Sequence, residues 1–301
     1  MVETYREAPL DMEVVFKILV EGIKKYFHES HIKNAVIGLS GGIDSTVVAA
    51  LCRAANIPLI GVSLPCSSNA DVENDSALAA GKEFCDSFKV VNLQEPYEVM
   101  EKFCTNASGA EKTAISQGNI KARLRMITLY DIASKVGGLV MDTDNLTEHF
   151  LGFWTLHGDD ADFNPIGGLW KHEVYALARY MKENVFKESN ALEQAIALMP
   201  TDGNGVKEGG DLAQIAPGKT YDDVDEILHA WVGLDPRVKE IVLHDYFDYG
   251  VFKKLCEKHG YETVEAVIMR SVRSEFKRKQ RPFIIDVYRG LICEKDGKIL
   301  G

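Results

Sequence analysis

Apolar and polar positions follow two patterns along the first half of the chain. Short, nearly continuous apolar runs end at glycine-rich or polar residues, which indicates buried strands. The predicted strands are residues 34–39, 58–64, 88–93 and 137–143. Elsewhere apolar residues recur at helical spacing. The predicted helices are residues 10–28, 46–55, 71–85, 95–107 and 115–136. Strands that alternate with helices predict an α/β fold with a doubly wound parallel sheet flanked by helices.

The pattern changes after residue 168, where amphipathic stretches follow one another without apolar runs between them. The sequence therefore predicts a mainly helical C-terminal portion. Its helices are predicted at 169–183, 189–197, 222–232, 237–246 and 262–278. The polar, glycine-rich residues 201–218 predict a mobile loop that becomes ordered when ligands bind. We expect residues 1–285 to form one domain. Residues 286–301, with a predicted hairpin about Asp296 and Gly297, extend beyond it without an assigned role.

Composition and charge narrow the class of protein. No apolar run reaches the roughly 18 to 20 residues of a membrane helix, and the N-terminus lacks the order of a signal peptide. We therefore expect a cytoplasmic protein with no membrane partner. The net charge of −11 argues against nucleic acid as a partner, because such binding depends on Lys and Arg that neutralise phosphates. Six scattered cysteines without a CxxC pair indicate reduced thiols rather than a zinc site.

The string GLSGGIDST at 38–46 joins a predicted strand to a predicted helix. Backbone N–H groups at such a turn can surround phosphate oxygens, and Gly41 and Gly42 let the backbone approach closely. A carboxylate beside phosphate is repulsive unless a cation lies between them, so Asp44 is a candidate Mg²⁺ ligand. The loop is not a Walker A motif, because no GxxxxGK[ST] occurs in the sequence. The alternative is an ordinary turn in which Asp44 and Ser45 cap the helix.

A second candidate segment is QGNIKARLRM at 117–126. On a helix Arg123 shares a face with Asn119 and Met126, and its guanidinium could hold a carboxylate or phosphate by two hydrogen bonds. The alternative is a solvated basic face.

The third segment, TDNLTE, follows a predicted strand. Asn145 and Glu148 have the spacing of a capping box, which is a purely structural interpretation. Because parallel strands bind ligands beyond their carboxyl ends, Glu148 is also expected beside the first loop, as a second Mg²⁺ ligand. Lys171 then begins a helix where acids are usually preferred, which suggests a phosphate nearby. Before it lies an acidic cluster that could bind a nucleotide: Asp159, Asp160 and Asp162.

Together with SEFKRKQRP at 274–282, these segments resemble the NAD synthetase family of N-type ATP pyrophosphatases, over about residues 10–285. The resemblance implies an adenine nucleotide alpha hydrolase-like fold and a homodimer, for which the opening helix 10–28 is our candidate interface. It also implies an AMP-forming ligase. Such an enzyme adenylates the carboxylate of deamido-NAD with ATP, and ammonia then displaces AMP to give NAD. The ammonia would come from solution or from a partner, because residues 1–33 are too few for a glutaminase domain.

The same resemblance implies roles for individual residues. It places ATP, the co-substrate, at Gly38, Leu39, Ser40, Gly41, Gly42, Ile43, Asp44, Ser45, Thr143, Lys171 and Thr201. It places Mg²⁺ at Asp44 and Glu148, and deamido-NAD at Arg123, Asp162, Phe276 and Lys277. The catalytic residues it implies are Asp44, Lys171 and Lys277.

Two positions depart from the family pattern, because Phe276 replaces the usual His of short ammonia-dependent members and Leu156 replaces a Lys. Two other functions stay open. One is another N-type ATP pyrophosphatase, GMP synthetase-like or tRNA-modifying. The net acidity disfavours tRNA, and the absence of paired catalytic cysteines disfavours sulfur transfer. The other is a non-catalytic nucleotide-binding protein.

Overall fold

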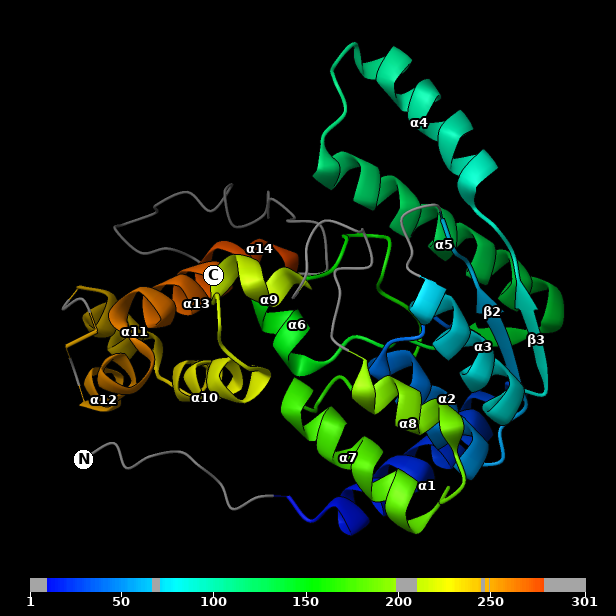
Figure 1. Cartoon of the computed structure of the whole chain (residues 1–301), viewed down its shortest axis with the longest axis horizontal. Coiled ribbons are helices and arrows are strands. Elements are labelled where there is room, and N and C mark those ends of the chain that lie inside the picture. The colour runs from blue at the N-terminus through cyan, green and yellow to red at the C-terminus, as the bar shows by residue number, and fades with distance from the viewer. Residues whose placement is uncertain (1–9, 67–70, 199–209, 245–246, 249, 279–301) are drawn as a thin grey trace, which may run out of the picture.

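A parallel sheet lies at the centre of the first half of the molecule. The computed structural model describes residues 10–66, 71–198, 210–244, 247–248 and 250–278 (Figure 1). Its strands are β1 (Asn34–Gly38), β2 (Leu59–Ser63), β3 (Ser87–Val90) and β4 (Gly138–Val140), in the spatial order β3-β2-β1-β4. All three pairings are parallel, and the predicted strands are confirmed, although each is shorter than predicted.

Helices cover both faces of this sheet, so the doubly wound α/β fold is confirmed. One face packs against α2 (Ile43–Ala54) and α3 (Asp71–Phe84). The helices α1 (Met12–Ser30), α7 (Lys171–Asn184) and α8 (Asn190–Ala197) pack on these two and complete the same core. The other face packs against α5 (Ala114–Val136), while α4 (Gln94–Ser108) projects from the body (Figure 1). Burial on both faces explains the strand sequences, because Ala35, Val36 and Ile37 of β1 are completely buried.

The chain after residue 168 is mainly helical, as predicted, but its first two helices, α7 and α8, belong to the core of the sheet. The later helices form a second unit with a hydrophobic core of its own. It comprises α9 (Gly210–Ile215), α10 (Tyr221–Val232), α11 (Pro236–His244), α12 (Gly250–His259), α13 (Tyr261–Arg273) and α14 (Glu275–Arg278). The short helix α6 (Leu146–Leu151) joins the two halves, because Leu151 packs in the second core while Asn145, at the start of α6, lies beside the sheet.

Several predicted boundaries need correction. The loop predicted at 201–218 contains α9, because Leu212 and Ala216 are buried in the second core and fix a helical turn between the glycines. Helix α12 was not predicted, and the helix predicted at 262–278 divides into α13 and α14 at Ser274. Residues 199–209 and the predicted hairpin at Asp296 lie outside the described residues.

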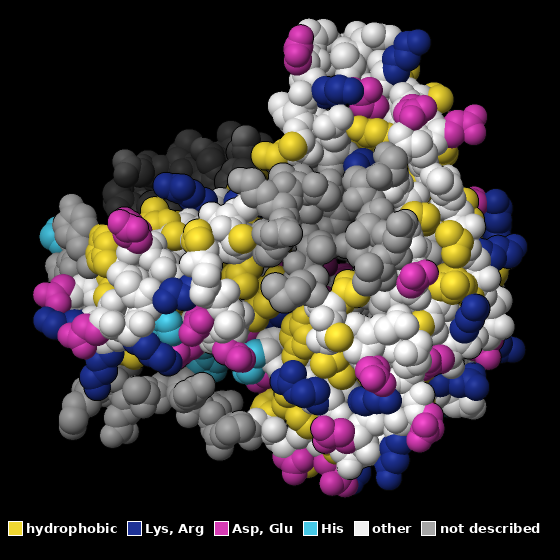
Figure 2. Space-filling view, viewed as in Figure 1, with side chains coloured by type: hydrophobic (Ala, Val, Ile, Leu, Met, Phe, Trp, Pro, Cys, Tyr) yellow, Lys and Arg dark blue, Asp and Glu magenta, His cyan; other side chains and the backbone are white. Residues whose placement is uncertain are grey.

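Two features of the described residues concern a membrane and nucleic acid, which the sequence disfavours as partners. None of the described helices is long and apolar enough to cross a bilayer. On the face shown in Figure 2, acidic and basic side chains are interspersed rather than gathered by sign.

Candidate active site

A cavity of about 510 Å³ opens beyond the carboxyl ends of the strands. Open parallel sheets place ligand sites at this edge, because the loops that leave neighbouring strands meet there. Its walls come from the loops after β1, β2 and β4, from α5 and α7, and from α10 and α13 of the second core. The cavity therefore lies where the sheet and the C-terminal helices meet.

The loop after β1 forms one wall. Gly41 has a φ of 86°, a conformation that favours glycine, and Gly42 begins α2 without a side chain that caps the helix. Ser40 Oγ accepts a hydrogen bond from Gly42 N at 3.2 Å and lies 3.2 Å from Ser45 Oγ. An N-terminus of this kind attracts anions, because its first N–H groups and the helix dipole both favour negative charge.

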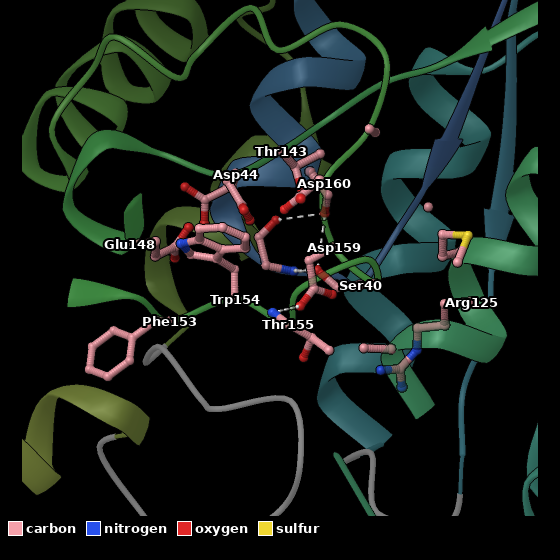
Figure 3. A pocket seen from close by; sticks show the side chains of 18 of the residues that line it. Ser40, Asp44, Arg125, Thr143, Glu148, Phe153, Trp154, Thr155, Asp159 and Asp160 are labelled. Carbon is pink, nitrogen blue, oxygen red and sulfur yellow. Dashed lines mark hydrogen bonds between the residues drawn. The ribbon is translucent and has the colours of Figure 1, made fainter. Parts of the chain in front are cut away.

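Lys171 connects this loop to the segment after β4. Its Nζ donates to Asp44 Oδ2 and, at 3.0 Å, to Glu148 Oε1, while Asn145 Nδ2 donates to Asp44 Oδ1 at 2.9 Å. The predicted capping box is confirmed, since Glu148 N donates to Asn145 Oδ1 at 3.1 Å and Asn145 N to Glu148 Oε2 at 3.2 Å. Figure 3 shows Asp44 and Glu148 close together in the cavity. The two predicted metal ligands thus face one cation.

Burial governs the charges of this group. Lys171 is only 4% exposed. Burial raises the pKa of the Glu148 carboxyl to about 7, although the Lys171 ammonium acts in the opposite direction. Burial also disfavours the charged form of Lys171, but Asp44 and Glu148 outweigh it and hold the pKa of Lys171 well above its ordinary value. The positive charge of Lys171 thus compensates two carboxylates in a poorly solvated place.

The donor set fits magnesium. Two carboxylates from separate segments point at one cationic group, and Mg²⁺ typically binds one or two carboxylates together with phosphates and water. Among the described residues, no group of three or more His, Cys, Asp or Glu side chains could hold a metal ion. A metal at Asp44 and Glu148 would therefore need phosphate oxygens to complete its ligands.

An acidic wall faces the loop after β1 (Figure 3). Asp159 and Asp160 line the cavity, as do Thr143 and Asp144. Asp159 Oδ2 accepts from Thr155 N at 2.6 Å, which fixes the turn that carries it. Burial raises the pKa of Asp144 well above its ordinary value, and raises those of Asp159 and Asp160 to a smaller extent.

Comparison of the chain with known protein families identifies its family. The family model described as NAD synthase matches residues 15–281 of the chain. The chain belongs to the NAD synthase family. It is accordingly an enzyme of the ligase class, and the family resemblance given by its motifs is confirmed.

Individual relatives of the family agree with this assignment. The NH₃-dependent NAD⁺ synthetase of Carboxydothermus hydrogenoformans is 36% identical over 215 residues, which are 70% of this chain and 82% of that one. The solved NH₃-dependent NAD synthetase from Campylobacter jejuni superposes with a TM-score of 0.67 at 26% identity, over 92% of this chain and 100% of that chain. The NMN synthetase from Francisella tularensis shares the fold, with a TM-score of 0.71 at 23% identity over 92% and 99% of the two chains.

Most of the residues that the family resemblance implied line the cavity. Those that line the cavity are Gly38, Leu39, Ser40, Gly42, Ile43, Asp44, Ser45, Thr143, Glu148, Lys171 and Lys277. Lys277 Nζ is held there by the carbonyl oxygens of Trp154 and, at 2.7 Å, Gly152. Gly41 shapes the loop through its backbone and is not among the lining residues.

Three predicted substrate contacts lie away from the cavity lining. Arg123 donates to the carbonyl oxygen of Leu156 at 3.2 Å. Asp162 accepts from Tyr130 Oη at 3.1 Å and from Val140 N at 3.0 Å, and Phe276 is 62% exposed. Thr201 lies outside the described residues. The roles of these four in ligand binding stay predictions.

Sequence reasoning missed other side chains of the cavity. Trp154 lines the cavity, and its indole Nε1 is a buried donor without a hydrogen-bond partner among the described residues. Its place directly after the Glu148 helix was a usable signal. Tyr221 of α10 lies with its ring centre 5.5 Å from Lys171 Nζ, and Arg270 of α13 also lines the cavity. Nothing local marked these two, because the packing of the second core brings them to the site.

Proposed function

We propose that the enzyme catalyses the ATP-dependent amidation of deamido-NAD to NAD, with ammonia as nitrogen donor and with AMP and pyrophosphate as products. The observation that carries this proposal is the convergence of Asp44 and Glu148 on Lys171, beside an uncapped helix N-terminus at the sheet edge. That group suits a magnesium-bound triphosphate. Membership of the NAD synthase family and the names of its NH₃-dependent relatives support the substrates.

In the first step a carboxylate oxygen of the nicotinate attacks the α-phosphorus of ATP, and the bond to the bridging oxygen breaks to release pyrophosphate. Charge builds on the leaving pyrophosphate. The amides at the start of α2 and the Lys171 ammonium, which lie at the cavity, would stabilise this charge. Magnesium, when bound by Asp44 and Glu148, would neutralise phosphate charge at the same place.

In the second step ammonia attacks the carbonyl carbon of the acyl adenylate, AMP leaves, and a proton is lost to give the amide. A free carboxylate would not react, because its leaving group would be oxide. The chain therefore needs no covalent nucleophile. Its contribution is to position the reactants and to exclude water, which would otherwise hydrolyse the adenylate.

Other roles in this proposal rest on the resemblance to the family. Thr143 and Lys277 line the cavity and are proposed to contact ATP and deamido-NAD respectively. Arg123, Asp162 and Phe276 are proposed to contact deamido-NAD, and Thr201 to contact ATP. We also propose a homodimer in the cytoplasm.

One assay separates this function from its rivals. Protein, Mg-ATP and ammonium are mixed with deamido-NAD, and NAD, AMP and pyrophosphate are measured. Equal amounts of the three products support the proposal. Parallel reactions with nicotinate mononucleotide, xanthosine monophosphate or tRNA test other acceptors. If AMP is released faster with one of these acceptors than with deamido-NAD, that acceptor is the substrate and the proposal is wrong. No AMP with any acceptor would indicate a non-catalytic nucleotide-binding protein.

A further inference from the structure

Asp225 of α10 is a completely buried carboxylate outside the cavity lining, at 1% exposure. It accepts hydrogen bonds from two other helices. Its Oδ1 accepts from Thr147 Oγ1 of α6, and its Oδ2 accepts from His172 N at 3.0 Å and lies 2.9 Å from His172 Nδ1 of α7. A single side chain of the second core therefore joins the first turns of two helices that carry site residues.

These bonds satisfy the N-terminus of α7, whose own sequence caps it only in part, through Glu173 Oε2, which accepts from Trp170 N at 2.8 Å. Trp170 precedes Lys171, and an indole has no acceptor for the free amides of the first turn. Instead Lys171 N donates to Thr147 Oγ1 at 2.9 Å, and His172 N donates to Asp225. The negative charge of Asp225 also lies at the positive ends of the α6 and α7 dipoles.

The hydrogen bonds of Thr147 and Asp225 lie next to Glu148 and Lys171, whose side chains meet in the cavity. Thr147 directly precedes Glu148, and the amide that donates to Thr147 belongs to Lys171 itself. The contact between Lys171 Nζ and Glu148 Oε1, at 3.0 Å, depends on how α6 and α7 lie relative to each other. Thr147 and Asp225 fix that relation through hydrogen bonds outside the cavity lining.

We propose that Asp225, acting through Thr147, is a positioning residue that holds Lys171 and Glu148 in register for the metal-bound triphosphate. The proposal rests on the proposed function for what those two residues do. Asp225 touches no reacting atom. Its contribution is geometric, and a displacement of about 1 Å in a reacting group can lower a rate by about 100-fold.

The experiment uses matched variants of the full chain. Thr147→Val removes the bridging hydroxyl with little change in shape, Thr147→Ser keeps it, and Asp225→Asn removes the charge. Glu226→Gln is the control, because Glu226 is the next residue of α10 and is also hydrogen bonded, but to Lys258 and His259 on the far side from the site. The measurements are kcat, KM for deamido-NAD, the Mg²⁺ concentration for half-maximal rate, and the melting temperature.

We expect Thr147→Val and Asp225→Asn each to lower kcat by about 10- to 100-fold and to raise the Mg²⁺ requirement, with KM for deamido-NAD within about twofold of the original. Thr147→Ser should recover most of the rate. The double variant should be no more than about threefold slower than the slower single variant, because both changes break one connection. Glu226→Gln should lower the melting temperature without lowering kcat.

A folded Thr147→Val variant with unchanged kcat and Mg²⁺ requirement would overturn the proposal and leave Asp225 a purely structural residue. If Asp225→Asn does not fold, the Thr147→Val and Thr147→Ser pair decides. If the original chain makes no NAD, the proposed function fails separately. The dissociation constant of Mg-ATP, measured by calorimetry, then tests positioning: weaker binding by Thr147→Val but not by Thr147→Ser supports it, and equal binding contradicts it.

Discussion

Lys171 is the residue on which the charges of the site depend. Its ammonium lies between two largely buried carboxylates, and removal of one partner from such a group leaves uncompensated charge. The same ammonium faces the cavity where a triphosphate would lie. Lys171 compensates Asp44 and Glu148 in the free enzyme, and we propose that it also stabilises phosphate charge during the reaction.

Replacement of this lysine by an apolar side chain tests both tasks. We expect Lys171→Met to lower kcat by about 100-fold or more, the usual effect of losing a preorganised charge beside a leaving group. Lys182→Met is the control, because Lys182 is on the same helix and its ammonium bonds to the carbonyl oxygen of Lys187 at 2.9 Å, away from the cavity. The measurement is the steady-state kcat of both variants. A kcat of Lys171→Met within about threefold of that of the original chain would contradict the prediction.

His172 predicts a pH effect on stability. Its hydrogen bond with Asp225 raises the pKa of His172 above the ordinary value of 6.5. The interaction of protonated His172 with Asp225 therefore stabilises the folded state at pH values below the ordinary pKa of histidine. This stabilisation disappears as the pH rises through the raised pKa of His172. The urea midpoint should fall more between pH 6 and pH 9 in the original chain than in His172→Gln. Parallel pH profiles of the two proteins would contradict this.

At the scale of elements, the unit of β1, its loop and α2 was predicted almost completely. The apolar run, the two glycines and the following helix all leave local signals, and the confirmed capping box at Asn145 is equally local. Elements fixed by distant packing were not predictable. Helix α9 forms because Leu212 is buried in the second core, although its glycine-rich sequence indicates a loop.

The same distinction holds for the site. Strand ends and capping signals were enough to predict that Asp44 and Glu148 would meet, because parallel strands bring their loops to one edge. The part of the site that comes from α10 left no such signal. Tyr221 and Asp225 reach α6 and α7 only through tertiary packing. Thr147 and Asp225, which are hydrogen bonded, are 78 residues apart in the sequence.

The backbone conformation of the loop after β1 predicts how a substitution at Gly41 affects ATP binding. Gly41 has a φ of 86°, so an alanine there would be strained by roughly 1–2 kcal/mol and would displace the amides at the start of α2. We expect Gly41→Ala to lower the melting temperature and to raise KM for ATP more than KM for deamido-NAD. Gly22→Ala is the control, because a Cβ at Gly22 meets nothing within 4 Å and alanine favours the helix. Equal increases in the two KM values would count against a specific role for the loop.

At the scale of the whole molecule, the projecting α4 offers a candidate interface for the proposed homodimer. Val99 and Phe103 of α4 are each 67% exposed, and Ile115 at the start of α5 is 78% exposed. Apolar side chains are also visible on this projection in Figure 2. The opening helix, which the sequence favoured as the interface, exposes Ile18 at 63%. Exposed apolar clusters of this kind mark interfaces, so both surfaces are candidates.

Sedimentation of two variants separates these surfaces. We expect the original chain to sediment as a dimer and Phe103→Glu to sediment as a monomer, because the buried charge would oppose association. Ile18→Glu should remain dimeric. The reverse result would assign the interface to α1, and a monomeric original chain would contradict the proposed homodimer.

The central claim is that Asp44 and Glu148 share one magnesium ion with the triphosphate. The most direct test is the dependence of NAD formation on Mg²⁺ concentration for Asp44→Asn and Glu148→Gln, with Asp131→Asn, an exposed carboxylate that pairs with Lys135, as control. Each site variant should need at least about 10-fold more Mg²⁺ and turn over more slowly, since magnesium at such a site has few protein ligands to lose. Site variants that keep the Mg²⁺ dependence of the original chain would contradict the claim.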